Sequence, residues 1–170
     1  MEAKDSICLI GMPGSGKSTI GKKLAKQIGY KFIDIDDYIE RVEKMTLQQI
    51  IEKKGDNYFC SIEEKYILEL LPLKHHVIAP GGSIIYSEKA MRLLQKSNVI
   101  VFLDVPLLDL KERLTDMESR GIVGLRSKTL NEIYNERISL YRKYANIVIN
   151  SGSKSPNEII EEIVKRIKVI

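Results

Sequence analysis

Five short apolar runs alternate along the chain with longer segments in which apolar residues recur at helical spacing. The runs span residues 6–10, 31–36, 76–79, 98–103 and 146–150. Their length and β-branched content predict strands, and the helices between them imply that neighbouring strands run parallel. A run as continuous as VIVFL is expected where helices cover both faces of a strand. The pattern predicts an α/β fold, a three-layer sandwich with a five-stranded parallel sheet.

The helical segments are bounded by residues that start or stop helices. We expect helices at 18–28, 46–54, 57–70, 87–96, 106–117, 129–145 and 157–169. Glycine or proline follows the first three of them, and Pro106 and Pro156 stand at favourable helix starts. The stretch ESRGIVGLRSKT at 118–129 places two glycines and two arginines between helices, and we interpret it as a mobile flap.

The composition is that of one globular domain spanning residues 1–170. Of the 170 residues, 44% are hydrophobic and 29% are charged, and no apolar stretch approaches the ~18 residues of a membrane span. The N-terminus lacks a signal-peptide layout, and Cys8 and Cys60 are not spaced for a zinc site or a disulfide framework. The net charge of +4 is spread among acids and bases. We expect a cytoplasmic protein with no membrane or nucleic-acid partner.

A glycine-rich motif, GMPGSGKST at 11–19, follows the first predicted strand and opens the first helix. Gly11, Gly16, Lys17 and Ser18 satisfy GxxxxGK[ST], the loop whose backbone N–H groups and helix dipole bind phosphates. Lys17 would lie on the β- and γ-phosphates, and Ser18 would be a ligand of Mg²⁺. We assign the loop residues Gly14, Ser15, Gly16, Lys17, Ser18 and Thr19 to the nucleotide, and infer ATP with Mg²⁺. The alternative is a plain strand-to-helix turn.

Two carboxylates at the end of the second predicted strand are candidates for the rest of a phosphoryl-transfer site. Asp34 and Asp36 are two apart, so on a strand they project from one face, at the carboxyl edge where open α/β sheets bind ligands. They would position the metal and orient the nucleophile. Asp37, and less so Asp36, can instead be explained as a helix cap, whereas Asp34 within a strand is harder to explain that way. Asp104 ranks lower as a metal ligand, because capping explains it.

In order and spacing these motifs resemble the shikimate kinase family, small P-loop kinases related to the nucleoside monophosphate kinases. The resemblance runs nearly end to end. It rests on GMPGSGKST, the pair Asp34 and Asp36, GDNYFCSIEE at 55–64, the glycines at 81–82, Arg113 with Arg120, ERISLYRKYA at 136–145 and NSGSKSP at 150–156. The resemblance implies a P-loop kinase with a short lid at about 114–126 and acceptor-binding helices within about 36–63.

The resemblance also implies a role for individual residues. It makes Lys17, Asp36 and Arg120 catalytic; Arg113 and Pro156 flank adenine, Asp34 holds Mg²⁺ through water, and the acceptor site contains Asp36, Phe59, Cys60, Gly81, Gly82 and Arg137. Within that set, Asp36 binds and activates the acceptor hydroxyl, and Arg120 closes on the phosphates. Gly81 and Gly82 contact the acceptor through their backbone, and Arg137 binds its carboxylate.

Three departures from the family pattern gather on the acceptor side. The family's second carboxylate-binding arginine follows the phenylalanine, but here Phe59 is followed by Cys60. Losing a charge-assisted hydrogen bond of about 1.5–3 kcal/mol weakens binding about tenfold to a hundredfold. Ser83 replaces the third glycine of the turn, with Pro80 ahead of the pair. The lid reads RGIVGL where RPLL is usual, and it is about two residues shorter.

Three functions are compatible with these residues. The first is a shikimate kinase, in which ATP phosphorylates shikimate to give shikimate 3-phosphate and ADP. The second keeps the reaction with another small hydroxy acid, such as homoserine or gluconate, as the acceptor. The third is a nucleotide-binding module without catalysis, which retention of Lys17, Asp34, Asp36 and Arg120 disfavours. We expect a monomer.

Overall fold

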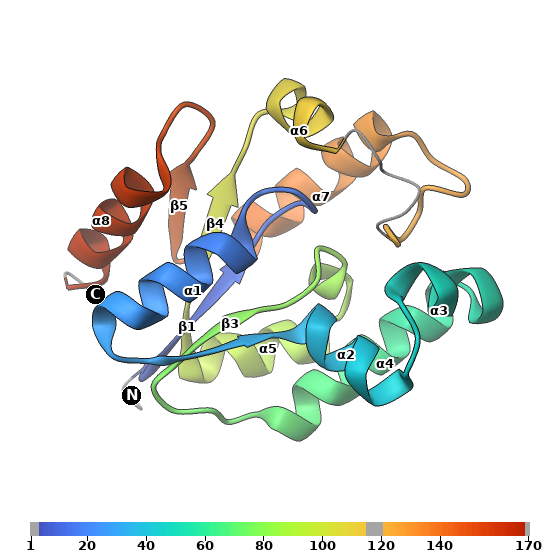
Figure 1. The fold of residues 1–170 in the computed structure, drawn as a ribbon, viewed down its shortest axis with the longest axis horizontal. Helices are drawn as coiled ribbons and strands as arrows, with labels where there is room; N and C mark the ends of the chain where they lie inside the picture. The colour runs from blue at the N-terminus through green and yellow to red at the C-terminus, as the bar shows by residue number, and fades with distance from the viewer. Residues whose placement is uncertain (1–3, 115–120, 169–170) are drawn as a thin grey trace.

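The computed structural model describes residues 4–114 and 121–168, which form a parallel sheet covered by helices on both faces (Figure 1). The strands are β1 (Ser6–Ile10), β2 (Lys31–Asp34), β3 (His76–Ala79), β4 (Asn98–Asp104) and β5 (Ile147–Asn150). They are all parallel and lie in the order β2-β3-β1-β4-β5. The predicted fold class is therefore confirmed, and β1 with its following loop occupies the centre of the sheet.

Eight α-helices and one 3₁₀ helix connect the strands in the described ranges. They are α1 (Lys17–Ile28), α2 (Ile35–Glu43), α3 (Leu47–Lys54), α4 (Asp56–Leu70), η1 (Ile84–Tyr86), α5 (Glu88–Ser97), α6 (Leu107–Arg113), α7 (Leu130–Tyr144) and α8 (Pro156–Ile167). Capping boxes begin α7 at Thr129 and α8 at Ser155, which fixes both starts within a residue of the prediction. α6 ends at Arg113, short of the predicted 117, and residues 115–120 lie outside the described part.

The alternation of side chains along β1 builds the two halves of the core. Ile7 and Leu9 pack with α1 and α8 on one face of the sheet, whereas Cys8 and Ile10 join the cluster formed with α2, α4, α5 and α7. All four side chains are buried, and burial of each large aliphatic side chain contributes about 1.5–3 kcal/mol. The central strand is thereby held rigidly beneath the loop that follows it.

The second strand is shorter than predicted. Asp34 ends β2, and its carboxylate accepts hydrogen bonds from the backbone N–H groups of Asp36 (3.0 Å) and Asp37 (3.3 Å). Asp34 is thus the N-cap of α2, and neither Asp36 nor Asp37 caps a helix. The expectation that Asp34 would not be a cap was wrong, because a cap satisfies the orphan N–H groups of a helix that begins directly after the strand.

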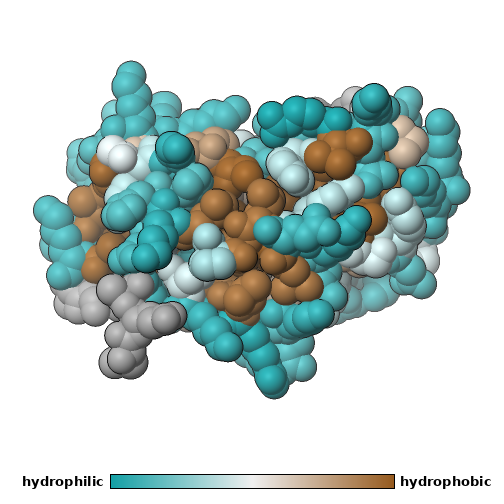
Figure 2. All heavy atoms as spheres, turned by 90° about the horizontal axis from the view of Figure 1, so that it is seen from below, coloured by the Kyte–Doolittle hydropathy of each residue, from teal (hydrophilic) through white to brown (hydrophobic). Residues whose placement is uncertain are grey.

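Within residues 4–114 and 121–168, no helix has both the length and the apolar character needed to cross a bilayer. Seen from below, apolar side chains form a continuous area in the middle of the molecule, bordered by polar ones (Figure 2). Exposed large apolar side chains elsewhere are scattered, with Leu108 on α6 the most exposed at 73%.

Candidate active site

The loop between β1 and α1 has the conformation of a phosphate-binding loop. Gly16, the N-cap of α1, has φ 93°, in the left-handed region that glycine adopts readily, and the loop closes through a hydrogen bond from Ser15 N–H to the Met12 carbonyl (3.1 Å). The Lys17 ammonium donates to the carbonyls of Gly11 (2.9 Å) and Met12 (3.1 Å). Burial lowers the pKa of Lys17, and the nearby carboxylates of Asp36 and Asp34 oppose this. The ammonium is therefore held at the mouth of the loop by the loop's own backbone.

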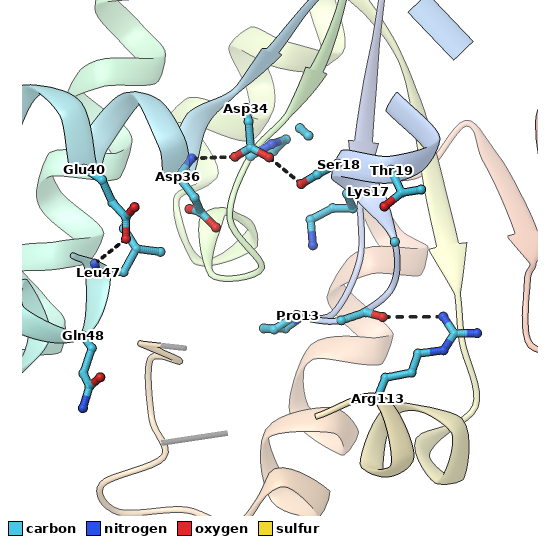
Figure 3. Close-up of a pocket in the computed structure, with 14 residues that line it drawn as sticks. Pro13, Lys17, Ser18, Thr19, Asp34, Asp36, Glu40, Leu47, Gln48 and Arg113 are labelled. Carbon is cyan, nitrogen blue, oxygen red and sulfur yellow. Dashed lines mark hydrogen bonds between the residues drawn. The ribbon is translucent and has the colours of Figure 1, made fainter. Parts of the chain in front are cut away.

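Asp34 and Asp36 approach the loop from two different elements. The Ser18 hydroxyl donates to one oxygen of Asp34 while the other oxygen caps α2, so Asp34 ties the start of α1 to the start of α2. Asp36 lies in the first turn of α2, so the prediction that both aspartates share one strand face was wrong. Figure 3 nevertheless shows both side chains directed toward the space beside Lys17.

A cavity of about 490 Å³ lies in front of the loop (Figure 3). Its lining is Pro13, Gly14, Gly16, Lys17, Ser18, Thr19, Asp34, Asp36, Glu40, Leu47, Gln48, Ala79, Pro80 and Arg113. The two aspartates and all the predicted loop residues but Ser15, which is buried, therefore line one cavity. β2 is separated from β1 by β3 in the sheet, and it is the carboxyl edge shared by these parallel strands that brings the two motifs together.

A second, smaller cavity of about 50 Å³ continues from the first on the side of α4 and α7. It shares Pro13, Lys17, Asp36 and Leu47 with the larger cavity and adds Phe59, Gly81, Gly82, Ser83, Gly121, Ile122, Val123 and Arg137. Five of the six residues expected to bind the acceptor, all but Cys60, line this space. Lys17 and Asp36 belong to both cavities, which places them at the junction between a nucleotide side and an acceptor side.

Arg137 is a buried cation held by three elements. It comes from α7 and is 1% exposed, its Nε donates to the Tyr86 hydroxyl (3.2 Å), and its Nη2 donates to the Val123 carbonyl (2.9 Å). Tyr86 in turn donates to Glu136 (2.5 Å). The pKa of Arg137 is raised by its contacts with Tyr141 and Tyr86 despite its burial, so this guanidinium stays charged at the acceptor side.

Sequence reasoning missed Glu63, a buried carboxylate at this site. It lies on α4, is 1% exposed, and accepts a hydrogen bond from the Ser83 hydroxyl (2.6 Å). Burial raises the pKa of Glu63 to about 6, while Ser83 and Arg137 hold it from rising further. Burial also raises the pKa of Asp36 to about 8. The neighbouring Glu63 contributes to this increase, and the ammonium of Lys17 opposes it. The available signal was a single acid on an otherwise apolar face of the helix.

Two carboxylate oxygens of the site have no partner. Among the buried side-chain atoms of the described ranges, Asp36 Oδ1 and Glu63 Oε1 belong to the few that make no hydrogen bond. A Cβ atom placed on Gly81 would lie 2.8 Å from Asp36 Oδ1 and 2.5 Å from Glu63 Oε1. Both oxygens therefore face the α-carbon of Gly81, where any side chain would collide with them.

The remaining predicted residues are less closely gathered. Arg113 is exposed and reaches the Gly14 carbonyl at 3.5 Å, and Pro156 is the first residue of α8, outside both cavity linings. Cys60 is half-buried beside Glu63, and burial raises the pKa of its thiol to about 11. Arg120 lies outside the described residues. The prediction that Asp104 caps the next helix was wrong, because Pro106 is the N-cap of α6. Asp104 instead forms an ion pair with Arg142 at 3.0 Å.

The described part of the predicted flap packs against the acceptor side. Ile122 is buried, and the Gly124 N–H donates to Asp56 at the start of α4 (2.9 Å). Together with the Val123 carbonyl on Arg137, these contacts place residues 121–124 over the smaller cavity. No cluster of three or more His, Cys, Asp or Glu side chains suited to a metal occurs in 4–114 or 121–168.

Comparison with known proteins agrees with this geometry. The family model described as shikimate kinase matches residues 13–168. A shikimate kinase of Sulfurihydrogenibium sp. is 38% identical over 163 residues, covering 96% of this chain and 98% of that protein. The structure is similar to that of a shikimate kinase from Acinetobacter baumannii in complex with shikimate, with a TM-score of 0.90 at 29% identity over 99% and 95% of the two chains.

A second solved structure, the shikimate kinase from Aquifex aeolicus, matches with a TM-score of 0.81 at 33% identity, covering 96% of each chain. The resemblance to the shikimate kinase family drawn from the motifs is therefore confirmed. The chain belongs to the shikimate kinase family and is a phosphotransferase with an alcohol group as acceptor.

Proposed function

We propose that the protein transfers the γ-phosphoryl group of ATP to a hydroxyl of shikimate, giving shikimate 3-phosphate and ADP. The observation that carries this proposal is the junction of the two cavities at Lys17 and Asp36. A donor phosphate bound by the loop and an acceptor bound near Arg137 would meet at these two side chains. The family relatives, which are named shikimate kinases, support shikimate as the acceptor.

On the nucleotide side, the loop amides and the N-terminus of α1 supply fixed partial positive charge to the phosphates. Lys17 exchanges its bonds to the Gly11 and Met12 carbonyls for the β- and γ-phosphates, which stabilises charge that spreads over the transferred group. Arg113 and Pro156 would flank adenine. A Cβ atom placed on Gly152 would lie within 2.9 Å of Pro106, so the β5–α8 loop, which leads to Pro156, lies beside the start of α6, the helix that carries Arg113.

The donor atoms at Ser18 and Asp34 fit Mg²⁺. Both are hard oxygen ligands already in contact with each other, which suits an ion that binds through few carboxylates plus phosphates and water. When bound, Mg²⁺ would neutralise charge on the phosphates. Asp34 would be retained in place by its cap interactions with α2, so the oxygen that meets Ser18 is already directed at the site.

On the acceptor side, Asp36 would orient the reacting hydroxyl and accept its proton, with its unpaired Oδ1 as the available oxygen. Arg137 would bind the carboxylate, for which its guanidinium is already desolvated and charged. The smaller cavity is too narrow for a ring acid while residues 121–124 cover it. Acceptor entry would therefore displace the Val123 carbonyl from Arg137, and return of the flap, with Arg120, would exclude water.

A second acceptor is favoured by one observation, the cysteine at position 60. Without the family's arginine there, the acceptor side offers one buried guanidinium to a carboxylate, and an acceptor such as homoserine or gluconate stays a candidate. The experiment is an ADP-release assay with shikimate, homoserine and gluconate under saturating ATP and Mg²⁺. We expect shikimate to give the highest kcat/KM. Turnover of another acid with none of shikimate would exclude the proposal, and failure of all three would favour a non-catalytic nucleotide-binding module.

The proposed reaction also leads to proposals for the location and the oligomeric state of the protein. A small polar acid and ATP are cytoplasmic metabolites, so we place the protein in the cytoplasm, acting as a monomer because both cavities are built from one chain. Size-exclusion chromatography with light scattering would test this: a mass near 19.4 kDa is expected, and a dimer mass would contradict it.

A further inference from the structure

Two departures from the family pattern meet at one buried carboxylate. Cys60 and Glu63 are three residues apart on α4, and side chains at this spacing lie on one face of a helix. Ser83, in the turn after Gly82, donates its hydroxyl to Glu63 Oε2 at 2.6 Å. Glu63 is 1% exposed and Ser83 is 4% exposed, so this hydrogen bond is shielded from water. Ser83 therefore bonds to this carboxylate from one element, and Cys60 lies on the same face of the helix that carries it.

A carboxylate buried to this degree requires donors or a nearby cation. Leaving it without either carries the full desolvation penalty, which is larger for a charged than for a neutral group. An arginine at position 60 would supply a cation on the face of α4 that carries Glu63. A glycine at position 83 would supply no side-chain donor. The chain has the reverse arrangement, with a small thiol at 60 and a hydroxyl at 83.

The hydrogen bond to Ser83 also decides which oxygen of Glu63 faces Gly81. Oε2 is occupied by the serine, while Oε1 has no partner among the described residues and faces Gly81 beside Asp36 Oδ1. The two carboxylates thereby flank the α-carbon of Gly81. Asp36 and Gly81 both line the smaller cavity, whereas Glu63 supports them and lines neither cavity.

We propose that the cysteine at 60 and the serine at 83 are one linked change, in which Ser83 takes over the support of Glu63 and thereby keeps Gly81 and Asp36 in the geometry that binds the acceptor. Ser83 is then a positioning residue for the acceptor, acting through Glu63. The inference rests on the proposed function only in that a hydroxy acid binds in the smaller cavity.

The test is a double-mutant cycle of the wild type, S83G, C60R and C60R/S83G. In the wild-type background we expect S83G to raise the acceptor KM about tenfold with kcat and the ATP KM within about twofold, the loss of one hydrogen bond to a charged group. In the C60R background, S83G should raise the acceptor KM less than about threefold, because the guanidinium at position 60 supports Glu63 in place of the serine. Equal effects in the two backgrounds would overturn the linkage.

A measurement without any acceptor separates this inference from the identity of the substrate. The four proteins are melted in the absence of ligands, where we expect S83G to lower Tm by about 4–8 °C alone and by about 2 °C or less with C60R. The same cycle is repeated with S83A in place of S83G, because alanine removes the hydroxyl without adding the backbone freedom of glycine. S151A, at another buried serine that bonds to a carbonyl, serves as the matched control and should add to C60R without coupling.

The two measurements give distinct outcomes. Coupling in Tm together with no turnover of shikimate would leave the linked change standing and reject shikimate as the acceptor. Coupling in Tm with turnover but no change in the acceptor KM would reject the positioning role of Ser83. Additive Tm shifts would reject the linkage itself, whichever acceptor is used.

Discussion

The nucleotide side and the acceptor side of the site are built in different ways. The nucleotide side is one continuous loop with the first turn of α1, and the phosphate ligands proposed for it are mostly backbone groups whose position follows from glycine conformations. The acceptor side is assembled from α2, α4, the turn after β3, α7 and residues 121–123, and the groups proposed to bind the acceptor include the buried charged side chains of Asp36 and Arg137. Arg137 and Glu63 are each held by a partner from another element.

This difference explains where the chain departs from its family. Substituting a residue in the loop disturbs a backbone conformation that no other residue can restore, so the loop motif is intact. A substitution on the acceptor side changes a side-chain partnership, and a second substitution on a neighbouring element can compensate for it. Arg137 with Tyr86 and Glu63 with Ser83 are partnerships of this kind.

The largest effect is expected at the junction of the two sides. Asp36→Asn should lower kcat about 10²–10⁴-fold, because the amide cannot accept the hydroxyl proton, and leave the ATP affinity within about threefold. Single-turnover transfer and nucleotide binding by calorimetry measure the two quantities. Asp37→Asn is the matched control, since Asp37 is exposed and lines neither cavity. Unchanged kcat in Asp36→Asn would remove this residue from catalysis.

Restoring the arginine of the family pattern at position 60 should strengthen binding on the acceptor side and leave the nucleotide side unchanged. Cys60→Arg is expected to lower the KM for shikimate about tenfold, since it adds a charge-assisted hydrogen bond of about 1.5 kcal/mol. The ATP KM should not move. Cys60→Ser, of similar size and uncharged, is the control. A KM for shikimate that stays constant or rises with arginine would contradict the placement of Cys60 beside the acceptor carboxylate.

The acceptor side should also contribute a pH dependence to stability that a glutamine at position 63 removes. The pKa of Glu63 is raised in the folded protein to about 6 from 4.5, so the stability due to its protonated form is lost as pH rises through this window. The shift corresponds to about 2 kcal/mol. Between pH 4 and 7 the Tm of the wild type should therefore fall relative to that of Glu63→Gln by about 4–8 °C. Parallel Tm curves would refute the shift.

The smallest effect is expected from the support of Arg137. Tyr86→Phe removes the hydroxyl that accepts from Arg137 Nε and should raise the acceptor KM about threefold at constant kcat, a loss near 0.7 kcal/mol. Steady-state kinetics with varied acceptor measure it. Tyr134→Phe, on α7 like Arg137, is the control. A fall in kcat without a change in KM would show that Tyr86 acts elsewhere than through acceptor binding.

The sequence predicted the sheet and the loop because their signals are local. Continuous apolar runs fix the strands, and the GxxxxGK[ST] motif carries its own conformation. The boundary at Asp34 was misjudged because the cap depends on a helix that starts without any break after the strand. Asp104 was predicted to be a helix cap, whereas its partner is Arg142, a residue 38 positions away that no local pattern connects to it.

On the acceptor side, the residue types were predicted but their partnerships were not. The resemblance identified Arg137, Gly81 and Gly82, yet Glu63 emerged only when α4 was placed against the turn after β3. Contacts across 20 residues or more arise from the packing of helices on the sheet, and one sequence holds little information about such pairs. The departures at 60 and 83 were visible in the sequence as separate changes, and their common partner was visible only in three dimensions.

The position of β1 has a consequence for synthesis on the ribosome. This strand precedes the other four in sequence but is paired on its two sides with residues 77–78 and 98–102, so it lacks one of its two neighbours until β4 has been translated. Its pairings are distant in sequence, and such pairings form late. A nascent chain that stalls before residue 98 thus leaves one edge of an apolar strand unpaired and open to chaperones.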